Sequence, residues 1–116
     1  MSRVGNRHLD NGIALKTEGK HVEALEELRL AAEDDPDDSE CYHQIGLVCG
    51  FLGLFEESLE NLQHAHRLDD LNITILNDLA LTYAMLGMYD EAKAAFTQVL
   101  TLDPGNGIAL KQISFF

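Results

Sequence analysis

The chain has 116 residues, of which 46% are hydrophobic, so it can form one continuous core but not two. Lys and Arg number 8 against 20 Asp and Glu, which gives a formal net charge of -12. A surface of this sign repels phosphate, and we therefore expect a protein or peptide partner with basic groups, no nucleic acid and no membrane.

The sequence indicates neither membrane insertion nor secretion. No stretch approaches the roughly 20 apolar residues of a membrane span, and residues 1–10 lack the apolar segment of a secretory signal. Cys41 and Cys49, if they share a helix, lie roughly 12 Å apart along it, beyond the Cα separation of about 7 Å that a disulfide tolerates. These features predict a cytoplasmic protein with reduced thiols.

An internal repeat of 34 residues organises the chain. Gly19, Gly53 and Gly87 are separated by this step. The same step relates three further sets of residues: Glu23, Glu57 and Glu91; Asp35, Asp69 and Asp103; Leu28, Leu62 and Phe96. So many matching positions exclude coincidence.

Each repeat unit is predicted to form two helices. The units are about 5–38, 39–72 and 73–106. Gly12, Gly46 and Ala80 hold one position of the repeat, where a small residue lets two helices approach closely while a leucine or phenylalanine fills the space opposite. A single pair of helices could not bury both apolar faces, so successive pairs are expected to stack into a continuous core.

The third unit illustrates the helix boundaries. Apolar residues between Ile75 and Leu86 recur at intervals of three and four, as on one face of a helix. Gly87 suits the left-handed cap that ends this helix, and Glu91 places negative charge at the start of the next. The turn residues around Pro104 end the second helix.

Residues 107–116 are predicted to form one short helix, below the length that is stable alone, which must dock on the second helix of the third unit. This segment is a candidate surface for homo-oligomer assembly. Its apolar residues are Leu110, Ile113, Phe115 and Phe116. Three explanations remain open for the two terminal phenylalanines: the chain is cut from a longer repeat protein, it dimerises through this end, or Phe115 folds over a groove.

No catalytic, cofactor or metal site is expected. The rings of His64 and His66 would point about 200° apart on a helix, so they cannot share a metal. Cys41 and His43, two residues apart, also face different ways. The acidic run at 34–38 lacks the glycine and terminal glutamate of a calcium-binding EF-hand loop. The chain contains neither a phosphate-binding glycine loop nor a nucleophile elbow.

The repeated residues resemble the tetratricopeptide repeat (TPR), a helix-turn-helix unit of the same length. In the third unit the match consists of Leu79–Ala80, Tyr83, Gly87, Tyr89, Ala92, Phe96 and Asp103–Pro104. The resemblance implies an all-α, right-handed superhelix (α-solenoid) of antiparallel helix pairs, with three repeats and a partial C-terminal helix. It also implies a non-catalytic protein–protein interaction module, an adaptor or scaffold that holds a partner peptide or helix in a concave groove lined by the first helix of each pair.

Carried over position by position, the resemblance predicts the residues of this groove. They are Leu9, Asp10, Ile13, His43, Gln44, Leu47, Phe51, Asn77, Asp78, Leu81 and Met85. The groove is thus expected to have an apolar seam with an acidic edge, which suits apolar side chains flanked by Lys or Arg.

Some TPR cochaperones grip the C-terminal carboxylate of heat-shock chaperones through a basic clamp. Here the clamp positions hold Leu9, Ile13, Gln44, Thr74 and Asp78, none of them positively charged, so no clamp is expected. The alternatives are a structural element that self-assembles end to end, and a chaperone-like holder of secretion substrates.

Overall fold

The computed structural model describes residues 5–116, which form α-helices and contain no strand. In chain order the helices are α1 (Arg7–Thr17), α2 (His21–Asp34), α3 (Ser39–Phe51), α4 (Phe55–Leu68), α5 (Ile73–Met85), α6 (Tyr89–Leu102) and α7 (Gly107–Ile113). No helix in this part of the chain is long and apolar enough to cross a bilayer. The expectation about a secretory signal rests partly on residues 1–4, which lie outside the described residues.

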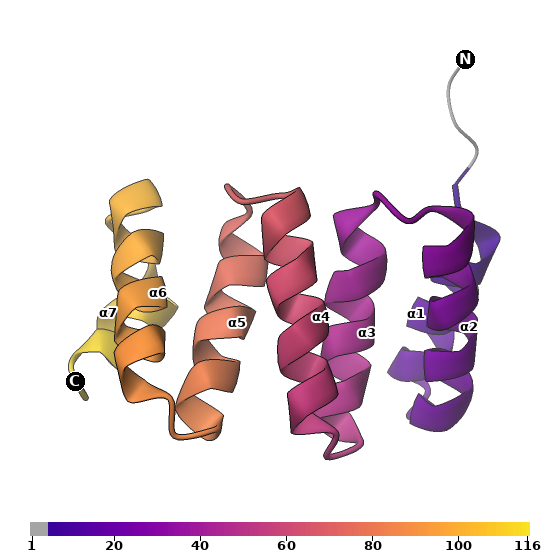
Figure 1. Ribbon diagram of the computed structural model, residues 1–116, viewed down its shortest axis with the longest axis horizontal. Coiled ribbons are helices and arrows are strands. Elements are labelled where there is room, and N and C mark those ends of the chain that lie inside the picture. The colour runs from indigo at the N-terminus through magenta and orange to yellow at the C-terminus, as the bar shows by residue number, and fades with distance from the viewer. Residues whose placement is uncertain (1–4) are drawn as a thin grey trace.

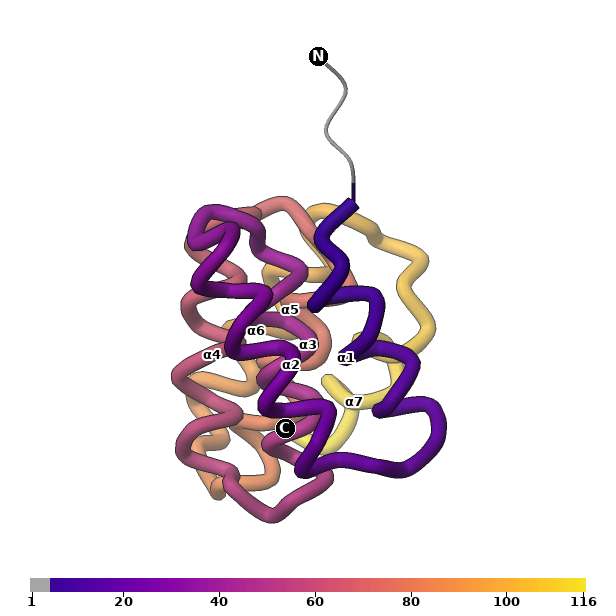
Figure 2. The backbone as a smooth tube through the Cα atoms, turned by 90° about the vertical axis from the view of Figure 1, so that its right-hand side faces the viewer, coloured from indigo at the N-terminus to yellow at the C-terminus, as the bar shows by residue number. Residues whose placement is uncertain are grey.

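Consecutive helices form the antiparallel pairs α1–α2, α3–α4 and α5–α6, which stack in chain order and end at α7 (Figure 1). Viewed along the stack, α2 and α4 lie on one side and α1 and α7 on the other (Figure 2). The all-α helical repeat that the 34-residue periodicity predicts is therefore confirmed.

Glycine makes the turn within each pair. The φ angles of Gly19, Gly53 and Gly87 are +81°, +77° and +76°, in the left-handed region where other residues are strained. The residue after each glycine then donates its N–H to a carbonyl of the preceding helix, as Lys20 does to Leu15 at 2.9 Å. This geometry satisfies a carbonyl at the helix end and reverses the chain within a few residues.

Close helix crossings explain the small residues of the first helices. A Cβ atom added to Gly46 would lie 2.7 Å from Cγ of Leu62, and one added to Gly12 would lie 2.5 Å from Cδ2 of Leu28. Beside the crossing of α3 and α4, the Ser58 hydroxyl donates to the Gly46 carbonyl at 2.7 Å, so the buried hydroxyl of Ser58 is satisfied.

The short helix α7 docks on the third pair. Ala109 is fully buried, and Phe116 packs against Phe96 with ring centroids 6.3 Å apart. Ile113 also lies against the core that Phe96 belongs to. Tertiary packing therefore stabilises a helix that would be too short to persist alone.

Candidate functional site

The expected groove residues are on α1, α3 and α5, and α1 lies on the same side of the stack as α7 (Figure 2). We call the surface formed by α1, α3, α5 and α7 the groove face. The structure divides its expected residues by exposure. The exposed ones are Asp10, Phe51 and Met85; the half-buried ones are Leu9, Ile13, Leu47, Asp78 and Leu81; the buried ones are His43, Gln44 and Asn77.

An apolar hollow of about 450 Å³ lies between α3 and α5, and we call it the first socket. Its apolar walls come from Leu47, Phe51, Phe55, Leu81 and Met85, and Gly50 and Asp78 also line it. Phe51 and Met85 are 64% and 63% exposed, so large apolar side chains stand open to solvent here. Four of the expected groove leucines, phenylalanines and methionines therefore meet in one hollow.

A second hollow of about 500 Å³, the second socket, lies between α5 and α7. Ala84, Tyr89, Gln112, Phe115 and Phe116 line it. Tyr89 is 60% exposed and Phe115 is 73% exposed, whereas Phe116 packs inward against Tyr89 with ring centroids 6.1 Å apart. Two of the residues expected at an assembly surface thus lie at the end of the groove face.

A chain of polar contacts crosses the groove face beside the first socket. Lys16 Nζ donates to Gln44 Oε1 at 2.6 Å, and Gln44 Nε2 donates to Glu40 Oε1 at 2.6 Å. His43 Nδ1 lies 3.5 Å from Glu40 Oε1, and His43 Nε2 donates to Asp78 Oδ2 at 2.7 Å. These contacts link α1, α3 and α5, so Gln44 and His43 connect helices and offer a partner little surface.

The charges in this chain shift two pKa values. Burial lowers the pKa of His43, but the hydrogen bonds to Asp78 and Glu40 outweigh it and raise that pKa to about 9. The same contact with His43 lowers the pKa of Glu40. At neutral pH, His43 is therefore a buried cation beside two carboxylates, and the negative charge of Asp78 is partly neutralised.

Asn77 has a similar bridging position further along the face. Its Nδ2 donates to Asn106 Oδ1 at 3.2 Å, which ties α5 to the turn before α7. Its side chain is 4% exposed. Asn77 therefore belongs to the contact between helices more than to the open surface.

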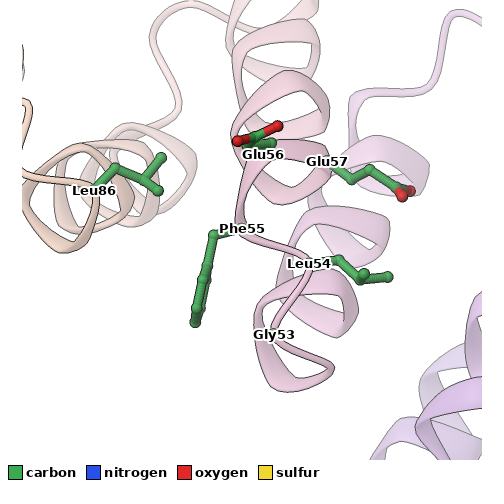
Figure 3. Close-up of a pocket in the computed structure, with 6 residues that line it drawn as sticks. All are labelled: Gly53, Leu54, Phe55, Glu56, Glu57 and Leu86. Atoms are coloured by element: carbon green, nitrogen blue, oxygen red, sulfur yellow. The ribbon is translucent and has the colours of Figure 1, made fainter.

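The first socket continues to the edge of the stack, where α3 turns into α4. A further hollow of about 370 Å³ shares Phe55 with it and includes Leu86 and Glu56 (Figure 3). In that view Leu54 and Glu57 extend away from Leu86. Glu57 accepts from Arg29 of α2 at 3.1 Å, whereas Glu56 is exposed beside the apolar surface.

Sequence reasoning missed Phe55 and Tyr89, which line the two sockets, and Lys16, which lies on the groove face. Phe55 and Tyr89 open the second helix of their pairs, and a search confined to first helices passes over them. The signal was present, because these two aromatic residues are 34 positions apart and 39% and 60% exposed. Lys16 was missed because its amine reaches along the face to Gln44, which the repeat pattern alone does not indicate.

Residues 5–116 contain no cluster of three or more His, Cys, Asp or Glu side chains that could hold a metal ion. Cys41 and Cys49 are fully buried. Burial also raises the pKa of the Cys49 thiol, which disfavours the reactive thiolate. The described residues form a surface with apolar hollows and charged edges.

Comparison with known proteins identifies the class. Models of the tetratricopeptide repeat match residues 39–70 and 73–106, which together make up more than half of the chain. The chain belongs to the tetratricopeptide repeat family. Members of this family are in general non-catalytic modules for protein–protein interaction.

Individual relatives share the fold over most of this chain. The NMR structure of the second TPR domain of human RPAP3, in complex with an HSP70 peptide, is 25% identical, with a TM-score of 0.86 over 93% of this chain and 90% of that one. The first TPR of Spaghetti (RPAP3), bound to the HSP90 peptide SRMEEVD, is 19% identical, with a TM-score of 0.88 over 97% of this chain and 92% of that one.

Among curated proteins, the N-terminal acetyltransferase A complex auxiliary subunit NAA15 of Arabidopsis thaliana is 30% identical over 95 residues. The match covers 82% of this chain but 11% of that protein. Two further curated relatives are matched over 9% and 15% of their length. The chain thus spans a small part of the curated proteins that it resembles.

Proposed function

We propose that this chain is a non-catalytic adaptor or scaffold whose groove face binds a partner segment with apolar side chains flanked by Lys or Arg. The observation that carries the proposal is the first socket, where Phe51 and Met85 are largely exposed around a hollow of about 450 Å³. Exposed apolar surface of this kind, edged by charge, is typical of interaction sites. The net charge of -12 favours a basic partner.

The proposal excludes the carboxylate tails that the RPAP3 domains bind. Of the positions where the family's clamp would stand, Gln44 is buried and bonded to Lys16, and Asp78 carries a negative charge. His43 neutralises part of that charge but is itself buried between Asp78 and Glu40, so it is not available to a ligand carboxylate. A peptide ending in Glu-Glu-Val-Asp is therefore expected not to bind.

Selection from a phage-displayed peptide library, followed by fluorescence anisotropy with the selected peptides, tests the proposal. Leu47→Asp and Leu81→Asp should each weaken binding while far-ultraviolet circular dichroism stays nearly unchanged. Leu30→Asp is the matched control, because Leu30 is 43% exposed on α2, away from the groove face. Selected peptides that bind all three variants equally would contradict the proposal. If Leu47→Asp or Leu81→Asp unfolds the chain, that leucine belongs to the core and its assignment to the groove is wrong.

Self-assembly through α7 is a second candidate, supported by the exposure of Leu110 and Phe115, which are 50% and 73% exposed. Light scattering over a concentration series, on the chain as given and on a version lacking 107–116, tests it. A dimer that becomes a monomer on truncation supports assembly. If both versions are monomers, self-assembly through α7 is contradicted and the groove face remains the proposed binding surface.

We further propose a cytoplasmic location, for which the buried thiols of Cys41 and Cys49 are the support. The binding unit is taken to be the repeats at about 5–38, 39–72 and 73–106 together with the partial helix at 107–116. Fractionation of cells that express the chain would test the location.

A further inference from the structure

We propose that the two sockets together bind one amphipathic helix of the partner, which crosses α3, α5 and α7 and presents two large apolar side chains seven residues apart. This inference rests on the proposed groove binding and specifies the conformation, spacing and charge of the segment bound. The two apolar side chains of the partner are called anchors below.

The sockets are equivalent positions of the repeat. Gly50 of the first socket corresponds to Ala84 of the second, one step of 34 residues later, and Phe55 likewise corresponds to Tyr89. Leu81 similarly corresponds to Phe115. Two hollows built from the same repeat positions can receive the same kind of side chain from one continuous partner.

The corresponding place one repeat earlier is closed. Lys16 stands where the sockets have Gly50 and Ala84, and Gln44 stands where the first socket has Asp78. Their hydrogen bond of 2.6 Å therefore spans the interval that is open in the two sockets. Beside it, the rings of His21 and Phe51 stack with centroids 4.9 Å apart. Over residues 5–116, the groove face consequently has two sockets in place of a uniform furrow.

The step between the sockets fits a helix. The first helices α1, α3, α5 and α7 are spaced along the 39 Å long axis of the molecule (Figure 1), so equivalent points of the two sockets, one repeat apart, are separated by roughly 10 Å. A helix rises about 10.5 Å over seven residues and returns to nearly the same face. In an extended strand, side chains on one face recur at about 6.6 or 13 Å, and neither value matches the distance between the two sockets.

The charges beside the sockets are also repeated. Phe55 is followed by Glu56 and Glu57, and Tyr89 is followed by Asp90 and Glu91, all of them exposed. Lys or Arg side chains next to each anchor would lie close to Glu56 and Asp90, whereas Glu57 turns toward Arg29 of α2 (Figure 3). A second copy of this chain is a poor occupant, because two surfaces of the same strongly negative sign repel each other.

The test uses fluorescein-labelled synthetic peptides of one Ala/Lys helical host, with fluorescence anisotropy as the readout. One peptide carries Phe at positions i and i+7, a second at i and i+5, a third carries a single Phe, and a fourth carries none. A fifth places Phe at i and i+3 of a proline-rich host, because the polyproline helix also repeats every three residues, or about 9.3 Å. Circular dichroism confirms the helicity of the first four.

The i, i+7 peptide should bind at least about tenfold more tightly than the i, i+5 peptide, which cannot place both anchors on one face. Gly50→Lys and Ala84→Lys each introduce the residue type that closes the interval one repeat earlier. Each variant should bind the i, i+7 peptide only as tightly as the unmodified chain binds the single-Phe peptide. Thr97→Lys is the matched control, because it adds the same charge at an exposed position on α6. Thermal unfolding verifies that each variant folds. The comparison of the i, i+7 and i, i+5 peptides uses the unmodified chain, so it stands even if a variant fails to fold.

Three outcomes would overturn this inference. The i, i+7 and i, i+5 peptides bind with equal affinity, the proline-rich peptide binds most tightly, or the peptide without Phe binds as tightly as the i, i+7 peptide. If library-selected peptides still lose affinity with Leu47→Asp in those cases, the proposed groove binding stands and only the helical two-anchor partner is wrong. If the selected peptides ignore Leu47→Asp as well, both proposals fail.

Discussion

Gly46→Ala is the most direct test of the close crossing between α3 and α4. The added Cβ would lie 2.7 Å from Cγ and 2.9 Å from Cδ2 of Leu62, and 3.3 Å from the carbonyl oxygen of Ser58. Leu62 is 1% exposed and belongs to the apolar core, so any shift toward the first socket, which it also lines, would disturb its core contacts. Overpacking of this kind costs about 1–3 kcal/mol.

Gly50→Ala in the same helix provides the matched control. Its Cβ would lie 3.7 Å from Oγ of Ser58, an ordinary contact. Both substitutions replace glycine by alanine within α3, where alanine is favoured by up to roughly 1 kcal/mol, so most of this gain cancels in the comparison. Gly50→Ala should therefore be more stable than Gly46→Ala by about 1–3 kcal/mol, the cost of the clash alone.

Urea unfolding followed by circular dichroism, with a thermal scan, measures this difference. With an unfolding entropy of about 2.1 cal/mol/K per residue, each kcal/mol corresponds to a shift in Tm of about 4 °C for this chain. Gly46→Ala should thus melt about 4–12 °C below Gly50→Ala.

A double-mutant cycle isolates the cause. In a Leu62→Ala background the two clashing carbon atoms are absent, so the penalty of Gly46→Ala should disappear. Equal midpoints for the two glycine variants would refute the reasoning. A penalty that persists without the Leu62 side chain would instead assign the strain to the backbone at Ser58.

The remaining predictions concern the polar chain, the turns and α7. The free energy of unfolding should fall as the pH rises from 6.5 to 9, because the pKa of His43 is about 9 in the folded chain and 6.5 ordinarily, and protonated His43 stabilises the fold. Urea unfolding at several pH values measures this slope, and His43→Gln should flatten it. Gly87→Ala should cost about 1–2 kcal/mol, because φ there is +76°, whereas Gly105→Ala should be nearly neutral in the same thermal scan. Removal of residues 107–116 should lower Tm, because it uncovers Phe96, which is fully buried; an unchanged Tm would show that α7 adds no stability.

Much of the architecture follows from the sequence because the repeat states the same local rules three times. Glycine at one position of each repeat requires a left-handed turn, and a small residue at another requires a close crossing; the structure has both, with Gly53 at φ +77° and Gly46 against Leu62. Such features depend on short-range sterics, which the residue type at a known position already expresses.

The fate of individual polar side chains depends on neighbours from other helices. His43, Gln44 and Asn77 share a face with the groove leucines by periodicity, but each is buried against a hydrogen-bond partner from another part of the stack. The partner of His43 is on α5, that of Gln44 is on α1, and that of Asn77 is in the turn before α7. Periodicity assigns a residue to a face; it does not say whether a long side chain on an adjacent helix will cover it.

By itself, the sequence determined the helical repeat, its turns, its apolar core and the acidic character of the chain, since these depend on residue type and spacing along one helix. Only the tertiary structure decided that Lys16 closes one interval while Gly50 and Ala84 leave two sockets open. The physical reason is that a socket is the space left between side chains of different helices, and its volume depends on how those helices pack.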